Sequence, residues 1–321
     1  MVRNIALKKV IQDVIRIPEI TILFPVMIVI LVGISVSPKF LTISNIYTMI
    51  RNISYIGIVS IFMTFLLMSK GLDLSCDAVA GFCSIVFAYT MQKLSWSPIV
   101  CITTALALSA VIGYANGLLV TKVGIPSFVV TLGMLSIAKG ATLILSNGSY
   151  IMIHNDFLSI SNVKVLGISL DVYAFIIIAI IADILLRYTG AGRKIALLGT
   201  NASSAVVAGI RTVKITIILY VAIAVGTGFA ALLFTFRSGI GMTDCGTSWA
   251  LQAITACVIG GTSLYGGSGS ILGTIFGVFF MGLLTNIMSL LSIKAEWQYV
   301  GIGLFMVLGI VLEVYRSNKL R

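Results

Sequence analysis

The sequence predicts an all-α polytopic membrane protein with about ten transmembrane or re-entrant helices. Hydrophobic residues make up 59% of the 321 residues and charged residues only 10%, whereas a soluble globular domain carries roughly a quarter charged residues. The mean hydropathy is +1.13. The apolar segments are long enough for spanning helices rather than barrel strands. We therefore expect a single transmembrane domain over residues 1–321, embedded in a lipid bilayer.

Polar and glycine-rich stretches divide the apolar sequence into ten segments. Several segments are shorter than the roughly 20 residues that a perpendicular helix needs to cross a bilayer, which indicates broken or re-entrant helices. The first run is too long for a cleaved signal peptide, so we expect it to be retained. The expected helices lie at 19–37, 54–69, 76–92, 98–121, 127–146, 171–187, 214–236, 247–259, 271–291 and 296–314.

Residues 38–53 separate the first two expected helices and have their own pattern. Apolar residues recur there at near-helical spacing, at Leu41, Ile43, Ile46, Met49, Ile50 and Ile53. This spacing predicts an amphipathic helix on the outer membrane surface.

The basic residues indicate topology rather than nucleic-acid binding. The net charge is +11, but the charges gather in alternate loops, which is the positive-inside pattern. With both termini in the cytoplasm, fourteen basic residues fall inside and six outside, and Lys139 falls within a helix. The inside residues are Arg3, Lys8, Lys9, Arg16, Lys70, Lys122, Arg187, Arg193, Lys194, Arg211, Lys214, Arg316, Lys319 and Arg321; the outside ones are Lys39, Arg51, Lys93, Lys164, Arg237 and Lys294.

The cysteines and the histidine indicate neither a metal site nor a catalytic triad. The five cysteines lie in or beside apolar segments without a C-x-x-C pair, as expected of small packing residues. The only histidine is His154, in an expected outer loop. We therefore expect no metal site and no enzyme activity, since an intramembrane enzyme needs a nucleophile–base pair or a metal cluster.

Two aspartates stand four residues apart in the stretch GLDLSCDAVAG, residues 71–81. Asp73 lies where a helix begins, so its carboxylate could cap that helix, with Ser75 sharing the role, or contact a solute. Asp77 would lie on the same helix face, where like charges repel. It should therefore pair with a cation, be protonated or face water, and Lys70 is the nearest cation in sequence.

The inside loop at about 188–213 contains a short helical signal. TGAGRK lacks the spacing of a phosphate-binding loop, so we expect no ATP site in this chain. A helix-capping asparagine, a run of small residues and a glycine stop follow. This segment is either a connector or a helix that docks in a partner's groove. Its residues are Asn201, Ala202, Ser203, Ser204, Ala205, Ala208 and Gly209.

Two further polar or glycine-rich segments lie between or within apolar helices. In the run at 259–273, Gly260, Gly261, Thr262 and Ser263 could line a pathway or form a tight turn, and spacing favours the turn. The pattern Gly273-x-x-x-Gly277 indicates close helix packing.

In the segment 124–140, Pro126 after Gly124 starts a helix. The hydroxyls of Ser127 and Thr131, on either side of Phe128, either stabilise packing or line a pathway. Lys139 lies within two turns of the helix end, so we expect its side chain to extend towards the membrane surface. Asp183 and Arg237 could each face the bundle interior or the interface, and the sequence leaves both options open.

Four motifs in these segments carry a family resemblance. They are G-L-D-L-S at 71–75, G-x-P-S-F-x-x-T-L-G at 124–133, N-A-S-S-A-x-x-A-G-I at 201–210 and G-G-T-S-L-x-G-G at 260–267. In order and spacing they resemble the permease subunits of ribose-type ABC importers, which carry sugars and related polar solutes. The similarity extends from P-E-I at 18–20 and F-L-T-x-x-N at 40–45 to the last helix.

The resemblance implies a type II importer-like permease with ten helices and no cofactor of its own. It implies a partner permease subunit, in a homodimer or heterodimer, with the pathway on the shared axis. ATP and Mg²⁺ would bind a separate cytoplasmic ATPase, and an extracytoplasmic solute-binding protein would deliver the solute. Residues 201–210 would be the coupling helix, and the protein would lie in the bacterial cytoplasmic membrane with both termini inside.

The sequence departs from the family where V-G-S usually follows the G-L-D-L-S motif. Cys76-Asp77-Ala78 stands there instead, which puts a ribose substrate in doubt. A neutral sugar is the default solute, with autoinducer-like sugars, polyols and nucleosides open. We expect Asp77→Gly to leave assembly intact and change transport. The alternative function is an ion- or proton-coupled transporter or channel that uses Asp73, Asp77 or Asp183.

Overall fold

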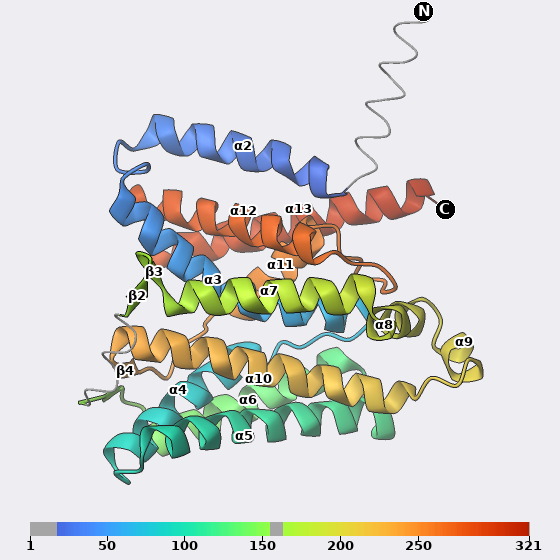
Figure 1. Ribbon diagram of the computed structural model, residues 1–321, viewed down its shortest axis with the longest axis horizontal. Helices are drawn as coiled ribbons and strands as arrows, with labels where there is room; N and C mark the ends of the chain where they lie inside the picture. Colours follow the sequence, from blue (N-terminus) through green and yellow to red (C-terminus); the bar gives the residue numbers. More distant parts are fainter. Residues whose placement is uncertain (1–17, 155–162, 321) are drawn as a thin grey trace, which may run out of the picture.

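The computed structural model describes residues 18–154 and 163–320, and this part of the chain is predominantly helical (Figure 1). Polar caps, prolines and glycines separate long apolar runs, so the helices begin and end close to the expected positions. The helices are α2 (Pro18–Val36), α3 (Ile43–Met68), α4 (Cys76–Gln92), α5 (Pro98–Leu118), a π-helical turn η1 (Leu119–Val123), α6 (Ser127–Ser146), α7 (Leu170–Tyr188), α8 (Gly190–Thr200), α9 (Ala202–Val207), α10 (Thr212–Ser238), α11 (Trp249–Ile259), α12 (Ile271–Leu290) and α13 (Ala295–Leu320).

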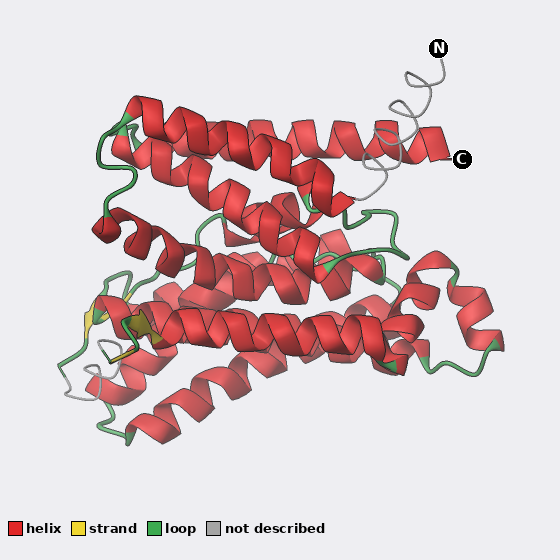
Figure 2. Ribbon diagram, turned by 45° about the horizontal axis from the view of Figure 1, so that its top comes forward, coloured by secondary structure: helices red, strands yellow, loops and turns green. Residues whose placement is uncertain are grey.

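The long helices run between two different ends of the molecule. At one end, β1 (Ile151–Met152) pairs antiparallel with β4 (Ile240–Gly241), and β2 (Lys164–Val165) pairs with β3 (Ile168–Ser169). At the other end, α8 and α9 project beyond the bundle (Figures 1 and 2). We call these the strand end and the α9 end. The start of α2 and the last turns of α13 both lie towards the α9 end (Figure 1).

Two apolar helices in the bundle, α4 and α11, are too short to cross a bilayer alone. Helix α4 has 17 residues and α11 has 11, whereas a perpendicular span needs roughly 20. Each follows a non-helical segment, at 69–75 and 242–248. The second segment runs antiparallel along α4: Met242 N–H donates to Ser84 Oγ over 3.1 Å, and Ser248 N–H reaches Asp77. The prediction of broken helices inside the bundle is confirmed.

The buried apolar side chains form two clusters. The larger joins α3, α4, α10 and α11, where the ring of Tyr55 stacks on that of Trp249 with 6.4 Å between centroids. The smaller joins α2, α12 and α13. Between α11 and α12, a β-carbon on Gly277 would collide with the Ala256 carbonyl. The Gly273–Gly277 pattern therefore marks close helix packing, as predicted.

The prediction of a separate surface helix at 38–53 is wrong. Residues 43–68 form one continuous helix, so the amphipathic stretch is the first part of α3 rather than a separate surface helix. No proline interrupts these residues, and burial changes along them from 87% exposure at Ile43 to 1% at Ile53.

Within the described residues, five helices are long and apolar enough to span a membrane: Ile43–Met68, Pro98–Val123, Ser127–Ser146, Thr212–Ser238 and Ile271–Leu290. Shorter apolar helices cover Ile22–Val36, Cys76–Gln92, Trp249–Ile259 and Ala295–Val311. These helices describe a polytopic membrane protein, and the count of ten spans stays a prediction. The basic residues Arg3, Lys8, Lys9, Arg16 and Arg321, which informed the predicted topology, lie outside the described residues.

Candidate functional site

The motif acid Asp73 lies in the non-helical segment before α4. Its Oδ1 accepts hydrogen bonds from the backbone N–H of Ser75 at 2.7 Å and from Ser75 Oγ at 2.5 Å. A side-chain oxygen bonded to the N–H two residues ahead is an Asx turn. Ser75, not Asp73, occupies the N-cap position of α4, so Asp73 shapes the turn that leads into the helix rather than capping it.

A buried polar cluster surrounds this turn. Asn116 of α5 donates from Nδ2 to Ser75 Oγ over 3.0 Å, and the Tyr220 hydroxyl of α10 donates to the Leu72 carbonyl over 3.3 Å. Asp73 Oδ2 and Asn116 Oδ1 are buried without a hydrogen-bond partner among the described residues. Such atoms are normally satisfied by ordered water. The cluster thus holds α4, α5 and α10 together around polar atoms that have spare bonding capacity.

Asp77 has a partner that sequence spacing could not show. Its Oδ2 accepts from the Ser248 N–H and its Oδ1 from the Ala250 N–H, both at 2.7 Å. These groups belong to the N-cap residue and the first turn of α11, and the side chain of that N-cap residue, Ser248, makes no capping hydrogen bond. Asp77 therefore caps α11 from the neighbouring helix, where the positive end of the helix dipole stabilises a carboxylate.

The structure corrects two predictions about lysines, the pairing of Lys70 with Asp77 and the outward direction of Lys139. Lys70 Nζ donates to the Thr200 carbonyl over 3.4 Å, so it does not pair with Asp77. Lys139 Nζ donates to the Thr243 carbonyl over 2.7 Å, so it does not extend to the surface. Helix α6 packs along α4, and the non-helical segment 242–248 offers a carbonyl that no helix uses. That carbonyl gives the ammonium group a partner inside the bundle.

We name the residues 71–77 and 242–250 the broken-helix junction. Two exposed polar residues in it, Asp244 and Thr247, were not among the predicted site residues. The sequence signal was present: T-D-C-G-T-S at 243–248 places an acid, a glycine and hydroxyls just before an unusually short apolar run. The junction combines polar side chains, a helix start and free backbone groups, which are the features of solute or ion pathways in membrane bundles.

The start of α6 divides the segment 124–140 between two environments. Pro126 is the residue before the helix and is exposed, and Phe128 is 52% exposed. Ser127 is half-buried. Thr131 is fully buried, and its hydroxyl donates to the Ser127 carbonyl over 2.9 Å. In this structure Thr131 lies in the packed face of α6 while Phe128 points outward.

Helix α9 has the geometry that the inside loop predicts. Asn201 Oδ1 accepts from the Ser204 N–H over 3.1 Å, and Gly209 ends the segment at φ +74°. Ala205 is buried and anchors the helix, whereas Ala202, Ser203, Ser204 and Ala208 are exposed. Val206 and Val207 are 59% and 90% exposed, so they give the helix an apolar tip.

Helix α8 precedes α9 and was not predicted. It begins where the Ala191 N–H donates to Thr189 Oγ1 over 3.1 Å. It buries Ile195 and Leu198 against the bundle. The sequence signal was the amphipathic run R-K-I-A-L-L-G-T at 193–200. Helix α8 therefore fixes the position of α9 relative to the bundle.

The glycine-rich loop between α11 and α12 lies at the α9 end of the bundle. The Gly267 N–H donates to the carbonyl of Met68, the last residue of α3, over 2.8 Å. Lys70 links the start of the junction to Thr200 at the end of α8. Gly260, Gly261, Thr262 and Ser263 begin this loop, which extends to residue 270 and is longer than the tight turn that spacing favoured. The loop connects the broken-helix junction to the support of α9.

Comparison with known sequences decides the family. Residues 45–310 match the family described as "Branched-chain amino acid transport system / permease component". The chain belongs to this family of permeases. The matched residues include the broken-helix junction, α9 and the glycine-rich loop.

Relatives of this permease are named as permease proteins of transport or import systems. The L-arabinose ABC transporter permease protein AraH of Azospirillum brasilense is 32% identical, over 88% of this chain and 84% of that protein. The ribose import permease protein RbsC of Escherichia coli K12 is 29% identical, over 91% and 92%. The autoinducer 2 import system permease protein LsrC of Shigella flexneri is 28% identical, over 92% and 86%. No solved structure matches the chain.

Charged residues elsewhere in the permease do not join the junction. Asp183 pairs with Arg187 on the surface of α7 at 2.8 Å, whereas Asp73 bonds to Ser75 and Asp77 to the start of α11. Arg237 donates to Asn52 Oδ1 over 2.9 Å. The three aspartates proposed for the alternative function therefore do not form one site in this structure.

Proposed function

We propose that this permease is the membrane-spanning subunit of an ATP-driven importer for a sugar or sugar-like polar solute. The proposal follows the relatives, whose names specify L-arabinose, ribose and autoinducer 2. A neutral sugar is the default solute. The broken-helix junction would supply the polar groups near the pathway, including Asp73, Ser75 and Asp77, with Ser127 and Thr131 of α6 and the loop at 260–263 as further candidates.

The exposed tip of α9 is the observation that carries the proposal. A six-residue helix with its own cap projects from the bundle, and Val207 at its end is 90% exposed. An apolar side chain in that position has no role in the packing of this chain. It suits docking into a groove on a partner protein. We infer that α9 is the coupling helix within the loop 188–213, and that an ABC ATPase with ATP and Mg²⁺ bound engages it.

The remaining parts of the assembly follow from the same proposal. A second permease subunit, identical or homologous, would complete the pathway in a type II importer-like arrangement. An extracytoplasmic binding protein would deliver the solute at the strand end. The single permease domain 1–321 would lie in the bacterial cytoplasmic membrane with the α9 end and both termini in the cytoplasm. This chain would bind no cofactor.

Uptake in proteoliposomes tests this function. The permease, reconstituted with its cognate ATPase and binding protein, should take up labelled sugar only when ATP is supplied. Val207→Asp should lower this uptake about tenfold, because a charge at a docking anchor disrupts the interface. Val207→Leu is the matched control and should retain uptake, since it keeps an apolar side chain at the same exposed position.

Two results would contradict the proposal. The first is sugar uptake by the permease alone, driven by a proton gradient without ATP, which is the behaviour of a secondary transporter. The second is unchanged ATP-dependent uptake in Val207→Asp, which would show that α9 does not transmit the action of the ATPase.

A further inference from the structure

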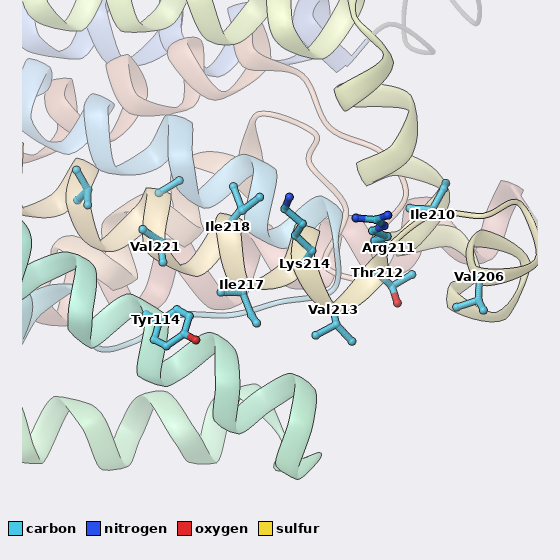
Figure 3. Close-up of a pocket in the computed structure, with 12 residues that line it drawn as sticks. Tyr114, Val206, Ile210, Arg211, Thr212, Val213, Lys214, Ile217, Ile218 and Val221 are labelled. Atoms are coloured by element: carbon cyan, nitrogen blue, oxygen red, sulfur yellow. The ribbon is translucent and has the colours of Figure 1, made fainter.

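An apolar groove lies between α5 and α10 and reaches α9 (Figure 3). Its volume is about 960 Å³. Aliphatic side chains of α10 form most of its surface, and the ring of Tyr114 on α5 closes one side. The lining includes Val206 of α9 and, on α10, Ile217, Ile218, Val221, Ala222 and Val225.

The groove has charge at one end only. Arg211 and Lys214 are exposed at the α9 end, and no hydrogen bond or ion pair of either side chain is found within the described residues. They lie at the N-terminus of the 27-residue helix α10, where the first backbone N–H groups and the helix dipole favour an anion. Beyond Ile217 the residues that α10 contributes to the lining are all apolar.

The dimensions of the groove match one leaflet of a bilayer. From Arg211 to Val225 it follows α10 for about 21 Å at 1.5 Å per residue. Half of a bilayer, with its headgroup layer, is roughly 20–22 Å thick. The groove is open to the outside of the bundle, since Tyr114 and Ile218 in its lining are each 52% exposed.

We propose that this groove binds one anionic glycerophospholipid of the surrounding bilayer. The phosphate contacts Arg211, Lys214 and the start of α10, and an acyl chain lies along Ile217, Val221 and Val225. Basic pockets between helices on the cytoplasmic side are known to bind anionic headgroups. Because Val206 of α9 also lines the groove, the bound lipid contacts the projecting helix directly. The site requires membrane insertion but no particular solute.

A lipid fits these observations better than a second copy of the chain or a peptide. The groove has two cations at the depth of the lipid headgroups and aliphatic side chains at the depth of the acyl chains. A phospholipid has its phosphate and its acyl chains in the same order. An interface with another protein would have to supply acidic groups for Arg211 and Lys214.

Native mass spectrometry of the full chain in detergent tests the proposal. Phosphatidylglycerol and phosphatidylcholine with the same acyl chains are supplied at equal concentration. We expect one phosphatidylglycerol to be retained roughly 30-fold more strongly than phosphatidylcholine. This is the preference expected from two basic residues near an anionic headgroup. The double variant Arg211→Gln/Lys214→Gln should reduce this preference to near parity. Lys122→Gln, which removes a basic residue at the same end but outside the groove, should retain it.

A groove-filling variant separates binding in the groove from surface attraction. Ala222→Trp keeps both cations and should reduce retention of both lipids, with Val221→Phe as a smaller substitution if folding is impaired. Unchanged preference in the double variant, or full retention in both filling variants, would overturn the proposal. So would cross-linking between two copies through Ile218→Cys, because a second subunit would then cover the groove.

Discussion

At the scale of single residues, the broken-helix junction depends on one carboxylate that bonds to backbone rather than to a cation. An ionisable residue inside a membrane bundle is expected to have a partner. Asp77 finds two N–H groups of α11 that would otherwise be left without acceptors. The residue that departs from the family pattern thus fixes the start of a half-helix, and its effect on stability should exceed that of an exposed acid.

We expect Asp77→Ala to destabilise the permease by about 2–4 kcal/mol, since two N–H groups lose their acceptor. The midpoint of thermal unfolding in detergent should fall by roughly 5–10 °C. Asp77→Asn keeps one acceptor oxygen and should cost about half as much. Asp77→Gly also removes the cap of α11. We therefore expect it to destabilise the permease as well, rather than to leave the assembly intact.

Asp183→Asn is the control for this measurement. It removes an acid from a surface pair with Arg187, in which the two side chains are 24% and 40% exposed, and it should cost at most about 0.5 kcal/mol. Equal melting temperatures for Asp77→Ala and the parent protein would show that Asp77 does not hold α11.

The sequence indicated that Asp77 needed a partner but could not identify it. The two N–H groups that donate to Asp77 lie 171 and 173 residues away in the sequence, and only the fold brings them close to it. The same reason explains Lys139, whose carbonyl partner is 104 residues away. Local signals, in contrast, were sufficient for Asn201 and Gly209, because a helix cap and a helix stop are properties of adjacent residues.

At the scale of elements, helix boundaries were predictable where proline, glycine or a capping residue marks them. Helices α4 and α6 have the expected bounds, 76–92 and 127–146. The errors at α3 and α8 occurred where no such residue stands at the boundary, or where a helix is amphipathic and charged rather than apolar. Sequence reasoning also missed the polar contact that joins α3 to α7 at the strand end.

That contact is a cluster around Asp171 at the start of α7. Arg51 Nε and the Tyr55 hydroxyl, both on α3, donate to Asp171 Oδ2 at 2.7 Å each. Asp171 is 3% exposed and Arg51 is 11% exposed. Since water cannot replace a missing partner there, the pair fixes the distance between two helices.

We expect Asp171→Ala to destabilise the permease by about 3–5 kcal/mol, because it removes the carboxylate that pairs with the buried Arg51 charge. The double variant Arg51→Met/Asp171→Leu should recover part of that loss, since apolar side chains can replace a buried pair, while the Tyr55 hydroxyl stays without its acceptor. A double-mutant cycle from melting temperatures measures this coupling. Additive effects of the two single variants would show that the pair does not connect α3 and α7.

At the scale of the whole molecule, the two ends of the bundle are chemically different. One end carries short strand pairs and the Asp171 cluster; the other carries α8, α9 and the basic mouth of the groove between α5 and α10. The start of α2 and the end of α13 lie towards the latter (Figure 1). The positive-inside pattern predicts that this end lies in the cytoplasm, and the proposed coupling and lipid sites both require that orientation.

Cysteine labelling tests the orientation on the complete permease. The five native cysteines are buried, so a membrane-impermeant maleimide should react with them little. Leu166→Cys and Val207→Cys place thiols at positions that are 92% and 90% exposed, at the strand end and on α9. We expect Leu166→Cys to be labelled in intact spheroplasts, and Val207→Cys only after the membrane is permeabilised. The reverse pattern would place α9 outside the cell, where no ATPase could reach it, and would move the anionic lipid to the outer leaflet.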